Sequence, residues 1–256
     1  MPGPSSLPHA GALSALVITT AAVAAVWALR ALQRRERRRD RRRVADFAQA
    51  VRAFLEQRLD ADELTAQAET AEPSVFWTTI EELVSRGAGW LRLSRALAGG
   101  PHLEEERRAL REESPWRREL AARRMGLLFS TASRRALRAA MTDGPELVTA
   151  AAAAALARYR DRRALAWVLD NPHAVGRRPH RQRVGLLCAF GHGGLPALTA
   201  ALERGTGDAA MDRAIIEALG LARHHAARRA VERRLREGDV EQRIAAARAL
   251  GRMEAT

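Results

Sequence analysis

The stretch AARRAVERRLREGDVEQRIAAARALGRM, Ala226–Met253, predicts a helix, a tight turn and a second helix. Apolar or small residues recur at spacings of three or four in each half, as in a helix with one buried face. These residues are Ala227, Val231 and Leu235 in the first half, and Ile244, Ala247, Leu250 and Gly251 in the second. Gly238 separates the halves, and Asp239 is placed to cap the second helix. Such a pair must pack on neighbouring pairs to bury its apolar faces.

The same plan recurs upstream at a period of about thirty residues. Each of the last four units closes its second helix on a small–apolar–small triplet. The triplets are Ala155–Ala157, Ala189–Gly191, Ala218–Gly220 and Ala249–Gly251. Two weaker copies precede them, at Ser74–Gly100 and Leu103–Ser130. We therefore expect six helix pairs that begin near residues 74, 103, 133, 162, 194 and 226.

This pattern resembles bacterial HEAT-type repeats, including the short bilin-lyase-like variety. That family often places an aliphatic–Arg pair early in the second helix. The corresponding pairs here are Val148–Thr149, Gln182–Arg183, Met211–Asp212 and Gln242–Arg243, and none of them has both residues. The resemblance implies an all-α fold in which residues 73–256 form an α-solenoid of about six pairs. It also implies that the second helices line the concave side.

The start of the chain has a different composition. Residues 1–10 are rich in Pro and Gly, and Gly11–Leu29 then carries no charge. About twenty apolar residues cross the hydrocarbon core of a bilayer, so we expect a transmembrane helix over residues 11–32. Trp27 near its end suits the membrane interface. A cleaved signal peptide or a buried core helix is the alternative, but a signal peptide needs positive charge before the apolar run, and here there is none.

Residues 33–43 form an Arg-rich segment directly after the apolar run. Because Arg and Lys accumulate on the cytoplasmic side, this segment predicts a single-pass protein of the bacterial inner membrane, with its N-terminus outside and its repeats in the cytoplasm. The same arginines can hold anionic lipid headgroups. They are Arg30, Arg34, Arg35, Arg37, Arg38, Arg39, Arg41, Arg42 and Arg43.

Residues 44–72 follow as two amphipathic helices, the second capped by Asp60 and ended before Pro73. They are either a juxtamembrane stalk or an N-terminal cap on the repeats, whose terminal units need atypical faces. Four tryptophans lie among apolar neighbours at helical spacing, which favours a place in the core over a base-stacking role. They are Trp77, Trp90, Trp116 and Trp167.

The formal net charge of +13 is at first sight typical of a nucleic-acid binder. The Arg-rich segment accounts for much of it, so we expect no nucleic-acid partner. The chain contains no phosphate-binding Gly loop and no HExxH, CxxC or nucleophile-elbow motif. His173, His180 and His192 surround one long turn without a Cys or carboxylate that completes a metal set. Cys188 has no base beside it in the pattern. We therefore expect no enzyme, no catalytic residue, no cofactor and no metal.

The stretched turn Asn171–Pro179 departs from the repeat, and insertions in solenoids often mark the binding face. Arginines of the second helices would lie on the concave side, as the resemblance implies. The candidate partner-binding residues are His173, Arg177, Arg178, His180, Arg181, Arg183, Arg213, Arg243 and Arg248. These features predict a membrane-tethered scaffold for an acidic, membrane-associated protein partner. The alternative is a HEAT-like enzyme or nucleic-acid binder, of the bilin lyase or DNA glycosylase type.

Overall fold

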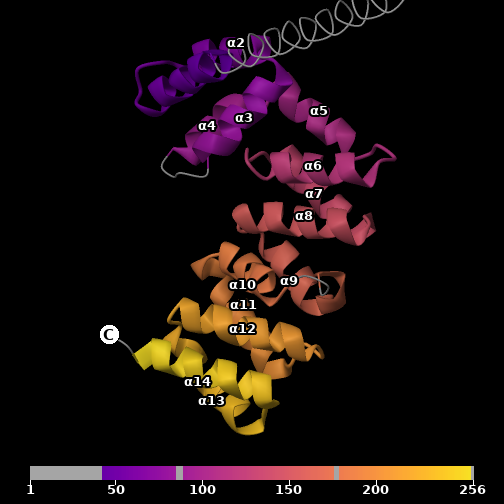
Figure 1. Cartoon of the computed structure of the whole chain (residues 1–256), viewed down its shortest axis with the longest axis vertical. Helices are drawn as coiled ribbons and strands as arrows, with labels where there is room; N and C mark the ends of the chain where they lie inside the picture. Colours follow the sequence, from indigo (N-terminus) through magenta and orange to yellow (C-terminus); the bar gives the residue numbers. More distant parts are fainter. Residues whose placement is uncertain (1–41, 85–88, 176–178, 255–256) are drawn as a thin grey trace, which may run out of the picture.

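The computed structural model describes residues 42–84, 89–175 and 179–254, and all regular structure in these ranges is helical (Figure 1). The expected all-α class is therefore confirmed for this part of the chain. The expected transmembrane helix over residues 11–32 lies outside the described residues. Within those residues, no single helix is long and apolar enough to span a bilayer, although the bent pair His180–Ala189 and His192–Arg204 passes by length and composition alone.

The helices of the first half begin with one that covers residues 42–55. It is followed by α2 (Ala61–Thr70), α3 (Pro73–Val84), α4 (Trp90–Leu97), α5 (Pro101–Ala109), α6 (Pro115–Met125), α7 (Thr131–Asp143) and α8 (Glu146–Arg158). The second half contains α9 (Arg162–Asp170), α10 (His180–Ala189), α11 (Leu195–Arg204), α12 (Ala209–Leu221), α13 (Arg228–Glu237) and α14 (Val240–Glu254). Short 3₁₀ turns precede α10, α11 and α13 at Pro172–Val175, His192–Gly194 and His225–Ala227.

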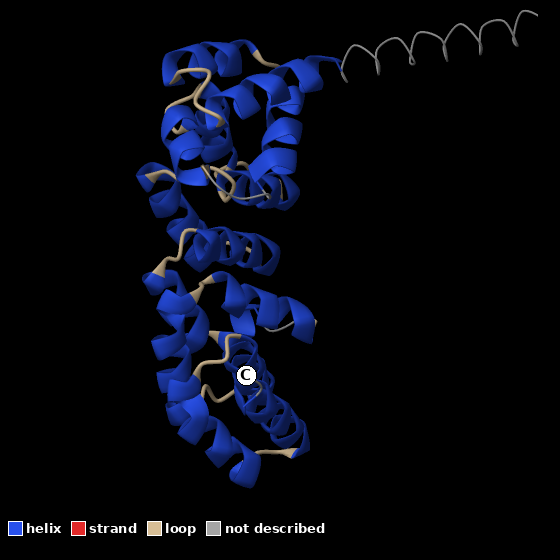
Figure 2. Cartoon of the chain, turned by 90° about the vertical axis from the view of Figure 1, so that its left-hand side faces the viewer, coloured by secondary structure: helices blue, strands red, loops and turns tan. Residues whose placement is uncertain are grey.

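From α5 onward, α5 packs with α6, α7 with α8, α11 with α12 and α13 with α14, each helix with the one that follows it. The second helix of each pair contacts the next second helix, in the order α6, α8, α10, α12 and α14. The first helices α9, α11 and α13 contact one another in the same way. Figure 2 shows the resulting elongated stack, in which the lower half bends with the first helices along its outer edge. The first helices begin within a few residues of the expected repeat starts.

Two glycines allow the second helices to approach closely. A Cβ on Gly220 of α12 would lie 2.6 Å from the Cβ of Ala249 and 2.7 Å from its Cα. Gly126, after α6, has the same relation to Ala155 of α8. Gly220 and Gly251 lie in the last turns of α12 and α14, close to the helix ends at which the sequence interpretation placed them. Gly220 is therefore a contact residue, and a residue in the left-handed region follows the helix instead, at Arg223.

The buried face of α14 differs from the predicted one. The helix buries Gln242, Ala245, Ala246, Ala249 and Met253, mostly small residues that fit against both α12 and α13. The predicted face is turned outward instead: Ala247 and Gly251 are exposed, Leu250 is half-buried and 42% of Ile244 is exposed. Alanine spacing is compatible with either face, so the period alone did not determine the rotation of the helix.

Buried carboxylates join neighbouring helices. Asp161 caps α9 by accepting from the backbone N–H of Ala164 (3.0 Å), and it also accepts from Nε (3.0 Å) and Nη2 (2.5 Å) of Arg138 in α7. Glu106 of α5 is paired with Arg117 and Arg124 of α6. Charge-assisted bonds of this kind offset the cost of burying a carboxylate. Each therefore makes adjacent helices interdependent.

Asp212 occupies the position where the resembled family often has Arg. Its carboxylate accepts from the N–H (3.0 Å) and hydroxyl (2.8 Å) of Thr206 and lies 3.2 Å from Arg234 in the next first helix. Arg234 also donates to the carbonyl of Leu202 (2.8 Å). Asp212 therefore links α12 to the turn before it and to α13 of the following pair.

Polar side chains cap several of the helices, and Asp60 and Asp239 are two caps that the sequence predicted. The side chains of Asp60, Ser114, Asp208 and Asp239 each accept a backbone N–H three residues further on. Asp143 is the last residue of α7, and Pro145 occupies the cap position of α8. Three of these four caps, Ser114, Asp208 and Asp239, begin the second helices α6, α12 and α14. The turns before these helices are therefore well defined by the sequence.

Residues 42–70 pack into the stack rather than standing apart from it. Phe47, Phe54 and Leu64 are buried in one hydrophobic cluster with Phe76 of α3. Arg92 of α4 donates to the carbonyls of Phe54 (2.5 Å) and Leu55 (2.6 Å), where the helix over residues 42–55 ends. These contacts favour the N-terminal cap over the juxtamembrane stalk.

Three of the four tryptophans are held by the fold. Trp77 is buried, Trp167 is half-buried, and the indole N–H of Trp90 donates to the carbonyl of Leu127 (2.5 Å). Trp116 was expected in the core, but 74% of it is exposed. It follows Ser114 and Pro115 at the first turn of α6, where the side chain projects away from the packed face. The expectation for Trp116 was therefore wrong.

Candidate partner-binding surface

The outward faces of α10, α12 and α14 form one continuous surface, which we call the second-helix surface. Its members are His180, Arg181, Arg183 and Cys188 on α10, Arg213 and Glu217 on α12, and Glu241, Arg243, Ile244, Arg248 and Arg252 on α14. The members on α12, and all but Arg243 on α14, recur at spacings of three or four and so share one side of their helix. Arg181 and Arg183 are two positions apart and lie on different sides of α10, as do Arg243 and Glu241 on α14. Of the predicted partner-binding residues, His180, Arg213 and Arg248 are thus brought together across the three helices.

Two ion pairs cross the grooves of this surface. The ring Nε2 of His180 lies 2.7 Å from Oε2 of Glu217, which joins α10 to α12. Nη1 of Arg213 lies 2.9 Å from Oε2 of Glu241, which joins α12 to α14. All four side chains keep substantial solvent access, so each pair contributes little to stability. Their effect is to hold His180 and Arg213 in defined positions.

Other cations on the surface are open to solvent. Arg181, Arg243 and Arg248 are exposed, and among the described residues no carboxylate lies within ion-pair distance of them. Arg183 is half-buried beside them. Arg213, Glu241, Ile244 and Arg248 surround a hollow of about 30 Å³, which is too small for an organic ligand.

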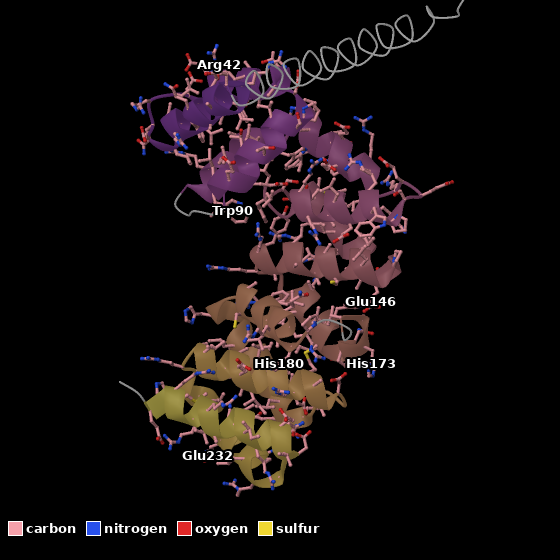
Figure 3. All side chains as sticks on the ribbon, viewed as in Figure 1. Arg42, Trp90, Glu146, His173, His180 and Glu232 are labelled. Atoms are coloured by element: carbon pink, nitrogen blue, oxygen red, sulfur yellow. The ribbon has the colours of Figure 1, made fainter. Side chains whose placement is uncertain are left out.

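The stretched turn lies elsewhere. His173 is at the edge formed by the turns, and its Nδ1 lies 3.5 Å from Oδ2 of Asp208 (Figure 3). It lines a separate hollow of about 560 Å³ with Glu146 and Trp167. Arg177 and Arg178 lie outside the described residues. His173 therefore lines a different hollow from Arg213 and Arg248.

Most of the Arg-rich segment, Arg30 to Arg41, also lies outside the described residues. Arg42 is exposed at the start of the described chain. Arg43 is half-exposed and paired with Glu72, which follows α2. Of the predicted headgroup-binding arginines that the structure describes, Arg42 is thus available to a ligand and Arg43 is partly neutralised by Glu72.

Cys188 is exposed on α10, close to the His180–Glu217 pair. Partial desolvation and the negative charge of Glu217 raise the pKa of its thiol. A thiol with a raised pKa is mostly protonated at neutral pH, and only the thiolate is a good nucleophile. His180 is engaged with Glu217, and no group in the described ranges lowers the thiol pKa. The geometry therefore gives Cys188 no nucleophilic activation.

Sequence reasoning missed the apolar and acidic members of the surface. Ile244 was assigned to the core, and Glu217 and Glu241 were not assigned at all. The i,i+4 spacing of Arg213 and Glu217 was a usable signal that both share one face. The Arg213–Glu241 pair was not predictable, because it depends on how α14 is rotated against α12.

In the described ranges, no three His, Cys, Asp or Glu side chains gather as a metal site.

Comparisons of the chain with protein-family models, with curated proteins and with solved structures find no match. The functional argument therefore depends on the second-helix surface itself.

Proposed function

We propose that this chain is a membrane-tethered α-solenoid scaffold of the HEAT type whose second-helix surface binds an acidic protein partner. The observation that carries the proposal is the position of Ile244. This side chain is exposed in the middle of α14, with Arg213, Arg248 and Arg252 around the same small hollow. Glu217 and Glu241 line the same hollow. An apolar side chain with arginines beside it is typical of protein-binding surfaces, in which Arg and large apolar residues supply most of the binding energy.

The charge of the surface indicates the chemistry of the partner. Arg181, Arg243 and Arg248 have no ion-pair partner in the described ranges, whereas Glu217 is hydrogen-bonded to His180 and Glu241 is paired with Arg213. The uncompensated charge is therefore positive. A helix or ridge that carries Asp or Glu around one apolar side chain would complement it, with the acidic residues on the arginines and the apolar residue on Ile244.

A nucleic-acid-binding or bilin-binding role is the alternative. A glycosylase-type site needs aromatic or apolar side chains that hold a flipped base, and the second-helix surface as defined contains no aromatic residue. A salt-sensitive shift of DNA would favour that class nevertheless, and a bound chromophore with visible absorbance would favour the bilin class. The composition of the second-helix surface supports a scaffold over either alternative.

The membrane part of the proposal depends on Gly11–Leu29 and the arginines that follow it. Tethering would confine the surface to two dimensions and raise the effective concentration of a membrane-associated partner. We expect a reporter that is active only outside the cytoplasm to be silent when it is fused after Thr256. Activity of that fusion would overturn the orientation with the N-terminus outside.

Site-specific photocrosslinking tests which layer binds the partner. A photoreactive residue in place of Ile244 on α14 is compared with one in place of Leu235 on α13, since both side chains are exposed aliphatic residues of the same helix pair. We expect one discrete adduct from position 244 and none from position 235. An adduct from position 235 alone would place the partner on the first helices and contradict the proposal.

A further inference from the structure

A second basic region lies away from the second-helix surface. A hollow of about 590 Å³ opens between α5 and α7, beside the start of α6. We call it the arginine hollow, since five arginines from three helices and one turn line it. They are Arg107 and Arg108 of α5, Arg111 of the following turn, Arg118 of α6 and Arg135 of α7. Arg107, Arg108, Arg111 and Arg118 are close in the sequence, and the fold brings Arg135 of α7 beside them.

Most of the positive charge around the arginine hollow is uncompensated. Arg107 is paired with Glu104. No carboxylate among the described residues lies within ion-pair distance of Arg108, Arg111, Arg118 or Arg135. Arg107 and Arg108 occupy the last turn of α5, where a cation is favourable beside the helix C-terminus. That effect does not account for Arg111, Arg118 and Arg135, whose mutual repulsion is a cost to the free protein.

Arg118 adds an independent observation. Its Nε is shielded from solvent and has no hydrogen-bond partner among the described residues. A shielded donor without an acceptor costs free energy in the free protein. Arginine presents its N–H groups as a planar fork that matches the oxygens of phosphate.

The size and floor of the hollow narrow the class of ligand. Its volume is in the range of small-molecule sites. Ala136, Ala139, Ala140 and Leu110 contribute an apolar floor between the arginines. A compact group with several negative charges satisfies converging arginines better than the single charges of an extended acidic peptide. We propose that the arginine hollow binds a phosphorylated organic anion, with its phosphoryl groups on Arg111, Arg118 and Arg135 and its apolar part on the alanine floor.

The same chemistry is available from a soluble phosphate ester and from a phospholipid headgroup. The test uses the purified full-length chain and two probes. Inorganic tripolyphosphate, titrated by calorimetry, represents the soluble source. Vesicles with and without phosphatidic acid, measured by co-sedimentation, represent the lipid source. Both probes are applied at fixed ionic strength, because exposed arginines attract any anion at low salt.

Two double variants with the same change in net charge separate a site from general attraction. Arg111→Glu with Arg135→Glu reverses two exposed arginines of the hollow, while Arg163→Glu with Arg233→Glu reverses two exposed arginines of α9 and α13 outside it. We expect the first pair to weaken binding of the effective probe by at least about thirtyfold, since hydrogen bonds to charged groups are strong. We expect the second pair to change it less than about threefold. Circular dichroism verifies that both variants stay helical.

Tripolyphosphate binding with this variant pattern supports the proposal with a soluble ligand. The same pattern for phosphatidic acid vesicles alone supports it with a lipid ligand. Equal losses in both double variants, or no binding of either probe to the unaltered chain, would overturn it. Binding of an acidic peptide in the hollow in place of both probes would also overturn the phosphate assignment.

Discussion

Replacement of Asp161 by alanine is expected to destabilise the folded protein by about 3 kcal/mol. The side chain of Asp161 is almost completely buried, and it serves two neighbouring helices at once. Loss of its cap on α9 costs about 1 kcal/mol. Loss of the charge-assisted bonds from Arg138 costs about 2 kcal/mol more. Chemical denaturation of the full-length chain measures the sum as a change in the free energy of unfolding.

Two further substitutions separate the contributions. Asp161→Asn keeps an acceptor for the N–H of Ala164 but removes the charge that faces Arg138, so it should cost about 2 kcal/mol. Asp170→Ala removes an acid of the same helix whose pair with Arg204 is mostly exposed, and it should cost less than about 1 kcal/mol. A small, equal effect of Asp161→Ala and Asp170→Ala would show that the buried link between α7 and α9 is absent.

Replacement of Gly220 by alanine is expected to destabilise the protein by about 2 kcal/mol. The added Cβ would lie 2.7 Å from the Cα of Ala249, and a backbone atom cannot move aside without moving α14. Overpacking of this kind costs about 1–3 kcal/mol, which exceeds the gain of up to about 1 kcal/mol from the better helix propensity of alanine. The same denaturation measurement detects it.

Gly185→Ala is the matched control for this second prediction. Gly185 lies inside α10, and a Cβ there would meet no atom within 4 Å. The helix-propensity gain is then unopposed, so Gly185→Ala should stabilise the protein by up to about 1 kcal/mol. The same chemical change therefore has opposite signs at two helical positions. Stabilisation by Gly220→Ala would mean that α12 and α14 do not pack as closely as the structure has them.

The sequence predicted the helices because their punctuation is local. Asp208 and Asp239 cap helices through hydrogen bonds to residues three positions away. Gly238 ends α13 directly before Asp239. Such signals depend on neighbouring residues alone. The order and approximate bounds of the helix pairs therefore followed from the pattern in the last four units.

What the sequence did not predict depends on contacts between helices. α14 is rich in alanine, and several of its faces are equally able to pack, so only α12 and α13 decide that Ala245 and Ala249 are buried and Ile244 is exposed. The role of Gly220 has the same origin, since a helix-ending glycine and a close-contact glycine look alike in sequence. The arginine hollow was hidden for a related reason: Arg111, Arg118 and Arg135 lie on three different segments.

The left-handed residues after α8 and α12 are a further case. Arg160 and Arg223 have φ of 53° and 49°, at the place where Gly191 has 67° after α10. Glycine is the residue that usually marks this position, so two arginines there gave no signal. The repeating geometry of these helix ends is thus clearer in the structure than in the residues.

The most direct test of the central claim is affinity purification of the tagged full-length chain from mildly solubilised membranes, with charge reversals on the two layers. Arg243→Glu with Arg248→Glu alters the second-helix surface, and Arg229→Glu with Arg233→Glu makes the same change in net charge on α13. The account predicts a stoichiometric protein partner that is retained by the α13 variant and lost from the second-helix variant. Equal retention by both variants, or co-purification of nucleic acid or a pigment in place of a protein, would contradict it.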